Sequence, residues 1–147
     1  MGRRDFLAAW AGIAVMLAGR RAHAQSREFT DAFSKLVGDA KVQPGRVTLE
    51  IPRLADNGNS VPLKVRVDSP MTAADHVTSI TLLSDRNPRP VLATFRFGPR
   101  AGHALVSTRV RLNGSQRVTA IARMSDGSIW TAQAPVEVTE SACLDAS

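Results

Sequence analysis

The chain has 147 residues with 19 Lys or Arg, 13 Asp or Glu and a single cysteine. This length suits one domain, and one cysteine excludes any disulfide within the chain. Two Trp, five Phe and no Tyr leave few side chains on which bases could stack, so we do not expect a nucleic-acid-binding protein.

Residues 1–24 have the pattern of an export signal. Arg3-Arg4 precede an apolar run, and a small-x-small site, Ala22-His23-Ala24, follows. The run is shorter than the roughly 20 residues of a membrane-spanning helix. Paired arginines before Phe-Leu favour the twin-arginine pathway over an ordinary Sec signal. We therefore expect cleavage before Gln25, a periplasmic location and no membrane attachment afterwards.

Cleavage also changes the charge. The formal net charge of the whole chain is +6. Residues 1–24 contain four arginines and one aspartate, so the remainder carries +3. The mature protein is therefore only mildly basic.

The first element expected after the signal is a short helix over residues 27–37. Apolar residues recur there at helical spacing, Ser26 is a suitable N-cap and Gly38 a suitable stop. Its single apolar stripe requires another element to pack against.

From Arg46 onward the pattern changes to the two-residue period of strands. The alternating segments are 46–52, 61–70, 76–85, 91–97, 104–113, 117–127 and 128–139. Gly, Pro, Asn or Asp bound each of them, and Asp126-Gly127 predicts a two-residue hairpin. About seven such strands without helices between them predict an all-β, immunoglobulin-like antiparallel β-sandwich over residues 25–139, with a C-terminal arm over 140–147.

The polar residues give little sign of an active site or a bound cofactor. His76 and His103 lie outside any metal-ligand spacing, so His76 is expected in a loop or at a strand edge and His103 in a hairpin turn. We expect no cofactor, no metal site and no catalytic residue in this chain.

The single thiol, Cys143, lies beyond the last predicted strand. Four or five residues separate it from the sandwich, a reach of at most ~17 Å. An odd cysteine in an exported protein is a free reactive thiol or half of an intermolecular disulfide, so a dimer linked through Cys143 is an alternative state. From position alone, a covalent carrier arm and an incidental tail thiol remain equal alternatives.

Several segments resemble SoxY, the carrier protein of bacterial thiosulfate oxidation. They are "VTLEIPRLADNGNSVPLKVRVDSPMTAADHV", "LLSDRNPRPVLATFRFGP" and "STRVRL…VTAIARMSDGSIW", within residues 29–139. The resemblance implies an immunoglobulin-like sandwich that forms a heterodimer with a SoxZ-like subunit. It also implies that Cys143 holds sulfur intermediates, persulfides among them, while other Sox enzymes couple thiosulfate to it, remove sulfate and oxidise the remaining sulfur. The chain would itself be a carrier without turnover.

The tail departs from that family's pattern. SoxY proteins usually end in Gly-Gly-Cys-Gly-Gly, whereas here Ser141-Ala142 precede the cysteine and Leu144-Asp145-Ala146-Ser147 follow it. Side chains widen and stiffen such an arm, and its acidic groups disfavour the thiolate. The alternative function is therefore a SoxY-like paralogue that acts as a structural or regulatory partner. An independent thiol enzyme or a generic sandwich module is a third alternative.

Overall fold

A computed structural model describes residues 25–140. The signal segment 1–24 and the arm from residue 141 onward lie outside the described residues. The elements are α2 (Arg27–Val37), β1 (Val42–Pro44), β2 (Val47–Glu50), β3 (Leu54–Asn57), β4 (Val61–Val67), β5 (Val77–Ser84), β6 (Val91–Arg96), β7 (Ala104–Val110), β8 (Gln116–Met124) and β9 (Ile129–Glu140).

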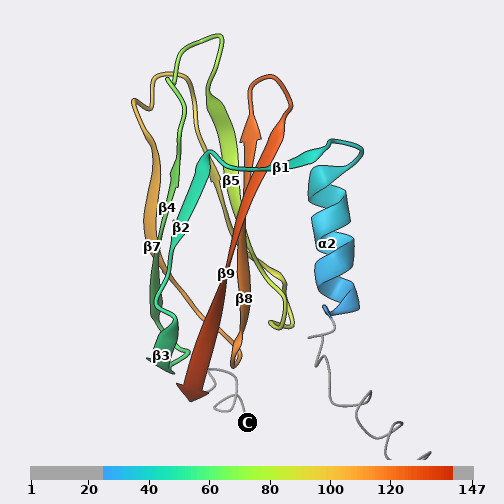
Figure 1. Cartoon of the computed structure of the whole chain (residues 1–147), viewed down its shortest axis with the longest axis vertical. Coiled ribbons are helices and arrows are strands. Elements are labelled where there is room, and N and C mark those ends of the chain that lie inside the picture. Colours follow the sequence, from blue (N-terminus) through green and yellow to red (C-terminus); the bar gives the residue numbers. More distant parts are fainter. Residues whose placement is uncertain (1–24, 141–147) are drawn as a thin grey trace, which may run out of the picture.

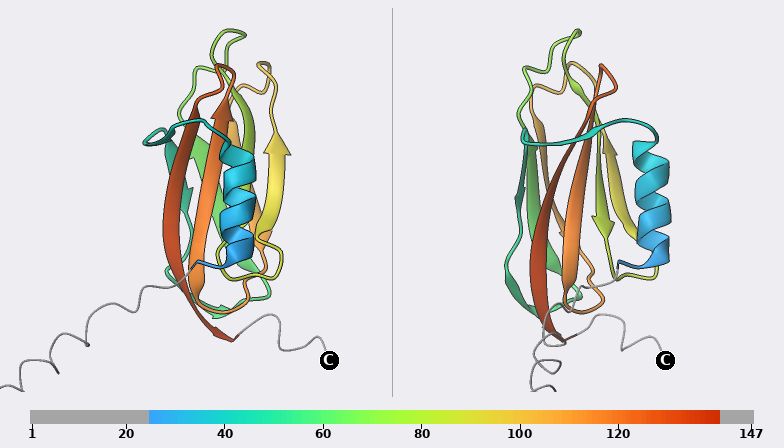
Figure 2. Two further views of the ribbon diagram at one scale, coloured as in Figure 1. Left: turned by 90° about the vertical axis from the view of Figure 1, so that its right-hand side faces the viewer. Right: turned by 45° about the vertical axis from the view of Figure 1, so that its right-hand side comes forward.

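The strands form two sheets that face each other, as expected for a β-sandwich (Figure 1). The larger sheet has the order β1-β9-β8-β5-β6, with β3 also paired to β9, and the smaller one has the order β2-β4-β7. Figure 2 shows α2 lying against the outer side of the larger sheet. The outer side of the smaller sheet carries no helix among the described residues.

Alternation along the strands creates the core between the sheets. In β4, Val61, Leu63, Val65 and Val67 are buried and the residues between them are exposed. They pack with buried apolar residues from β5, β7 and β8. Burial of each such side chain contributes about 1.5–3 kcal/mol, so this alternation fixes which face of β4 points inward.

The helix closes a second apolar cluster. Phe29 and Val37 of α2 are buried against Leu83, Ile121 and Ile129 on the outer side of the larger sheet. The predicted limits are confirmed: α2 spans Arg27–Val37, the Ser26 hydroxyl accepts the Phe29 N–H at 3.1 Å, and Gly38 ends the helix with φ +58°. The helix is therefore a fixed layer of the domain.

The sandwich class is confirmed, but the strand count differs from the expected seven. The described residues contain nine strands, because short segments on either side of β2 also pair. Both β1 and β3 run parallel to β9. The long β9 has room along its free edge for two short partners, and neither is long enough to show a clear alternating pattern.

The hairpin between β8 and β9 is present with a different loop. Met124 N–H donates to Ser128 O and Gly127 N–H donates to Met124 O, both at 3.0 Å. The loop therefore has three residues, 125–127, instead of the predicted two. Gly127 adopts φ +84°, the left-handed conformation that this three-residue loop requires.

Candidate functional site

The predicted sulfur attachment site, Cys143, lies outside the described residues. What the structure describes is the point from which its arm starts, the end of β9 at Glu140. Three further residues can carry the cysteine at most ~10 Å from Glu140. The end of the sandwich at Glu140 is therefore the nearest described part of the protein to Cys143.

The last residues of β9 are held on one edge by β3. In the parallel register Leu54 is opposite Glu137 and Asn57 is opposite Glu140. Gly58 N–H donates to Glu140 O at 2.9 Å, and the Thr139 hydroxyl donates to Asp56 O at 2.6 Å. The root of the arm is consequently fixed up to its last described residue.

A serine holds the other edge of β9. The Ser115 hydroxyl accepts the Val138 N–H at 2.9 Å and lies 3.3 Å from Val138 O, to which it donates. Ser115 belongs to the loop between β7 and β8, so this loop and β3 form hydrogen bonds with opposite edges of β9. These bonds hold the end of β9 next to the loops at this end of the sandwich.

Those loops are organised by a buried network of uncharged side chains. Ser84 and Gln116 are 0% and 4% exposed, and the Ser84 hydroxyl donates to Gln116 Oε1. Gln116 Nε2 donates to Asn87 Oδ1 at 3.1 Å, and Asn87 Nδ2 donates to Arg111 O at 2.8 Å. The network joins the β5–β6 loop to the β7–β8 loop. Sequence reasoning missed it, although Asn, Gln and Ser within "SDRNP" and "LNGSQ" were its available signal.

Charged groups, together with the hydroxyls of Ser69 and Ser125, hold the loops at the opposite end of the sandwich. Arg46 Nη2 lies 3.5 Å from Asp75 Oδ2, and its guanidinium carbon lies 5.2 Å from the centre of the Trp130 ring. In the β8–β9 hairpin, hydrogen bonds from the Ser128 side chain and then from its backbone N–H hold the pKa of Asp126 below its usual value. This end contains both predicted loop histidines.

His76 is placed as predicted, at a strand edge: it directly precedes β5, with Nδ1 2.9 Å from Thr72 O. The prediction of a hairpin turn at His103 is wrong, because this exposed residue lies in the connection between β6 and β7, which belong to different sheets. Within residues 25–140, no group of three or more His, Cys, Asp or Glu side chains could hold a metal ion. In the same range, no helix is long and apolar enough to cross a membrane.

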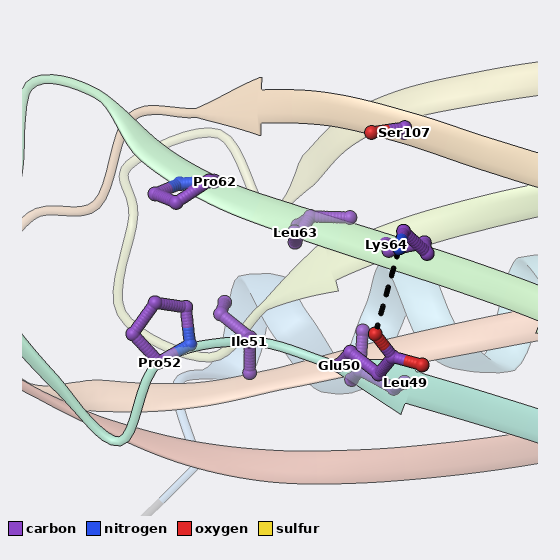
Figure 3. Close-up of a pocket in the computed structure, with 8 residues that line it drawn as sticks. All are labelled: Leu49, Glu50, Ile51, Pro52, Pro62, Leu63, Lys64 and Ser107. Carbon is purple, nitrogen blue, oxygen red and sulfur yellow. Dashed lines mark ion pairs between the residues drawn. The ribbon is translucent and has the colours of Figure 1, made fainter.

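A groove of about 430 Å³ lies on the smaller sheet (Figure 3). Its lining residues are Leu49, Glu50, Ile51, Pro52, Pro62, Leu63, Lys64 and Ser107. Glu50 and Lys64 project from the neighbouring strands β2 and β4 and form an ion pair of 3.8 Å. Ser107 is the only hydroxyl in this lining, and no histidine or cysteine accompanies it.

The fold and the site together define a rigid β-sandwich domain that holds the root of a cysteine-bearing arm. The chain belongs to the SoxY family of sulfur oxidation proteins, whose match covers residues 33–143. The matched region ends at Cys143, the single cysteine of the sequence.

Solved structures agree with this assignment. The sulfur carrier protein SoxY from Chlorobium limicola f thiosulfatophilum superposes with a TM-score of 0.64 and 26% identity, covering 76% of this chain and 96% of that chain. A superoxide reductase (neelaredoxin) from Ignicoccus hospitalis has a TM-score of 0.58 and 22% identity, over 64% and 80% of the two chains. A putative superoxide reductase from Thermotoga maritima has a TM-score of 0.57 and 21% identity, covering 69% of this chain and 95% of that chain. The two reductase likenesses show the fold alone. A comparison with curated proteins found no match.

Proposed function

We propose that this chain is a sulfur carrier subunit and that Cys143 covalently holds sulfur intermediates derived from thiosulfate. The observation that carries the proposal is the SoxY family match, which extends through the arm to the single cysteine. The likeness to a sulfur carrier SoxY over 96% of that protein's chain supports it.

The coupling step removes electrons from the thiol and thiosulfate. The terminal sulfur of thiosulfate forms an S–S bond with the Cys143 sulfur, the thiol proton is released, and two electrons leave the pair. A carrier cannot take up those electrons itself, so a partner enzyme must accept them. We infer that Cys143 visits such enzymes in turn and that the chain has no turnover of its own.

The geometry at the end of β9 supports this separation between a carrier and the enzymes that act on its cargo. The end of β9 is held on both edges through Glu140 and Val138, so the sandwich is a firm base for whatever the arm presents. A thiol with a reach of ~10 Å beyond this base can enter the active site of another protein. The flanking Ser141-Ala142 and Leu144 give this arm more side-chain bulk than a glycine-rich one.

The proposal includes location and partners. The twin-arginine pattern of residues 1–24 supports export to the periplasm. Membership of the SoxY family supports a SoxZ-like subunit as the stable partner and Sox enzymes as transient ones. The free thiol also allows a reductant-sensitive dimer through Cys143.

Intact-protein mass spectrometry of the periplasmic protein, purified without reductant from cells grown on thiosulfate, tests the proposal. We expect reductant-sensitive mass additions and co-purification of a SoxZ-like subunit. Cys143→Ser should lose every addition yet keep the fold and the partner.

Two outcomes would contradict this function. A bare thiol in actively oxidising cells would favour the paralogue, whose altered tail keeps the fold without the cargo. Turnover of thiosulfate by the isolated chain would favour a thiol enzyme instead.

A further inference from the structure

The loops at the arm-bearing end of the sandwich carry an excess of positive charge. The strand connections there, 51–53, 58–60, 85–90 and 111–115, contain the four arginines Arg53, Arg86, Arg89 and Arg111 and one acid, Asp85. The connections at the opposite end, 38–41, 45–46, 68–76, 97–103 and 125–128, contain three cations, Lys41, Arg46 and Arg100, and four aspartates. The loop charge is therefore +3 at one end and −1 at the other.

The arm-end arginines keep their charge available. Two ion pairs occur between described residues, Arg46–Asp75 and Lys64–Glu50, and neither involves these loops. Arg86 donates through Nη1 to the uncharged Ser115 O at 3.0 Å. Arg86, Arg89 and Arg111 are all exposed, so their positive charge faces solvent.

Two chains of contacts place these arginines beside the root of the arm. Arg86 bonds to Ser115, whose hydroxyl in turn holds Val138. Arg111 precedes Leu112, whose N–H donates to Gly58 O at 2.8 Å, and Gly58 holds Glu140. Both arginines are thus tied, through one or two intervening residues, to the last three residues of β9.

The arm itself carries the opposite charge. Glu140 and Asp145 flank the cysteine in sequence, and the described strand ends beside them also contain Asp56 and Glu137. Negative groups around a thiol disfavour its thiolate and repel anionic reactants. An anion that approaches the arm therefore needs compensating positive charge from somewhere close.

We propose that Arg86 and Arg111 form an electropositive collar beside the root of the arm, which offsets its acidic groups and draws sulfur oxyanions to Cys143. The collar deepens the function proposed above, because it rests on attachment at Cys143 and assigns the cargo's charge class. It acts by concentrating anions near the thiol and forms no fixed binding pocket.

The expected change in the reaction rate depends on the distance between the collar charges and the reagent and on the salt concentration. Unit charges 10 Å apart in water interact weakly, and screening has a length of about 30 Å at 10 mM salt and about 8 Å at physiological salt. Removing two collar charges should change the reaction rate of a monovalent anion by about 2.5-fold at 10 mM salt and about 1.5-fold at 150 mM. The reaction rate of a monovalent cation should change by the same factor in the opposite direction.

Two thiol reagents of opposite charge test the collar on the purified protein comprising residues 25–147. They are the methanethiosulfonates that transfer an ethylsulfonate or an ethyltrimethylammonium group. In both, the Cys143 thiolate attacks the sulfenyl sulfur, an S–S bond forms and methanesulfinate leaves, so no oxidant is needed. The measured quantity is the ratio of the anionic to the cationic rate.

Arg86→Gln/Arg111→Gln should lower this ratio about sixfold at 10 mM salt and about twofold at 150 mM. The matched control Lys41→Gln/Arg100→Gln removes the same charge from the far end and should change the ratio less than about 1.5-fold at 10 mM. Arg86→Lys/Arg111→Lys keeps the charge and should restore the ratio, which separates charge from loop structure.

An unchanged ratio in the collar variant, or an equal change in both charge-removing variants, would overturn the collar. The test is independent of the carrier function because it needs no Sox enzyme. The collar variant could lower the ratio as expected while the protein from thiosulfate-grown cells carries a bare thiol. This result would contradict the carrier function but still support the electrostatic effect of the collar.

Discussion

The two ends of the sandwich hold their loops by different means. At the far end, Arg46 is paired with Asp75 and lies over Trp130, so charge is used for structure. At the arm end, the uncharged Ser84 and Gln116 are joined where β5 ends and β8 begins, while the arginines of the adjoining loops are exposed. A domain can therefore keep charge free for approaching molecules when neutral hydrogen bonds organise the same loops.

The largest expected effect comes from breaking the neutral network. Gln116→Leu would leave the buried Ser84 hydroxyl and the Asn87 side chain without their amide partner. An unsatisfied buried polar group costs about 1–3 kcal/mol, so we expect the free energy of unfolding to fall by about 2–3 kcal/mol. Urea unfolding followed by circular dichroism measures it. A loss below about 0.5 kcal/mol would show that the network does not hold this end together.

Breaking the ion pair at the far end should lower the free energy of unfolding by less than Gln116→Leu does. The Arg46 and Asp75 side chains are 33% and 42% exposed, so solvent and salt screen their attraction. Such pairs contribute about 0–1 kcal/mol, and we expect Asp75→Asn to lower stability by about 0.5 kcal/mol. The same urea experiment at about 1 M NaCl is the control, because there wild type and variant should converge. A loss as large as that of Gln116→Leu would remove the distinction between the ends.

The smallest effect should appear in the pH dependence of the far-end hairpin. Hydrogen bonds from Ser128 lower the pKa of Asp126 from its usual value of 3.8. A lowered folded-state pKa means that the carboxylate stabilises the fold above pH 3.8 and that this contribution is lost as pH falls through the folded-state value.

Asp126→Asn isolates that contribution, because the amide oxygen can still accept the Ser128 N–H. Thermal unfolding from neutral pH down to strong acid should show a small advantage of wild type over the variant at neutral pH that disappears in acid. An advantage that grows in acid would have the wrong sign for a carboxylate stabilised by hydrogen bonds.

Much of the fold was predictable from local patterns. Helix α2 was predicted to the residue because Ser26 and Gly38 are strong end signals on either side of one apolar stripe. The alternation in β4 likewise identified its buried face, because every second residue there is apolar. In contrast, β1 and β3 were missed, because segments of three and four residues are too short to show a period, and what makes them strands is the edge of β9.

The site was predictable in part. Cys143 was singled out because it is the only thiol in the sequence, and the family match reaches it, but its role as the attachment site stays a prediction. The relation between Asn87 and Gln116 could not be predicted, since it joins loops 29 residues apart through a packing of strands that the sequence does not display. The collar was hidden for the same reason: Arg86 and Arg111 belong to different loops, and only the topology brings both loops to the arm.

The position of β9 also determines when the protein can fold. Val42 of β1, Leu54 of β3 and the whole of β8 find their partners in a strand that is synthesised after all of them. The larger sheet therefore cannot be completed during synthesis until residues 129–140 have emerged, and the pairings of β1 and β3 with β9, which are distant in sequence, form slowly. Until then β8 exposes an edge of unpaired backbone N–H and C=O groups that invites aggregation. A nascent chain of this design needs protection during its own synthesis, and any export route that accepts only folded proteins must wait for its final strand.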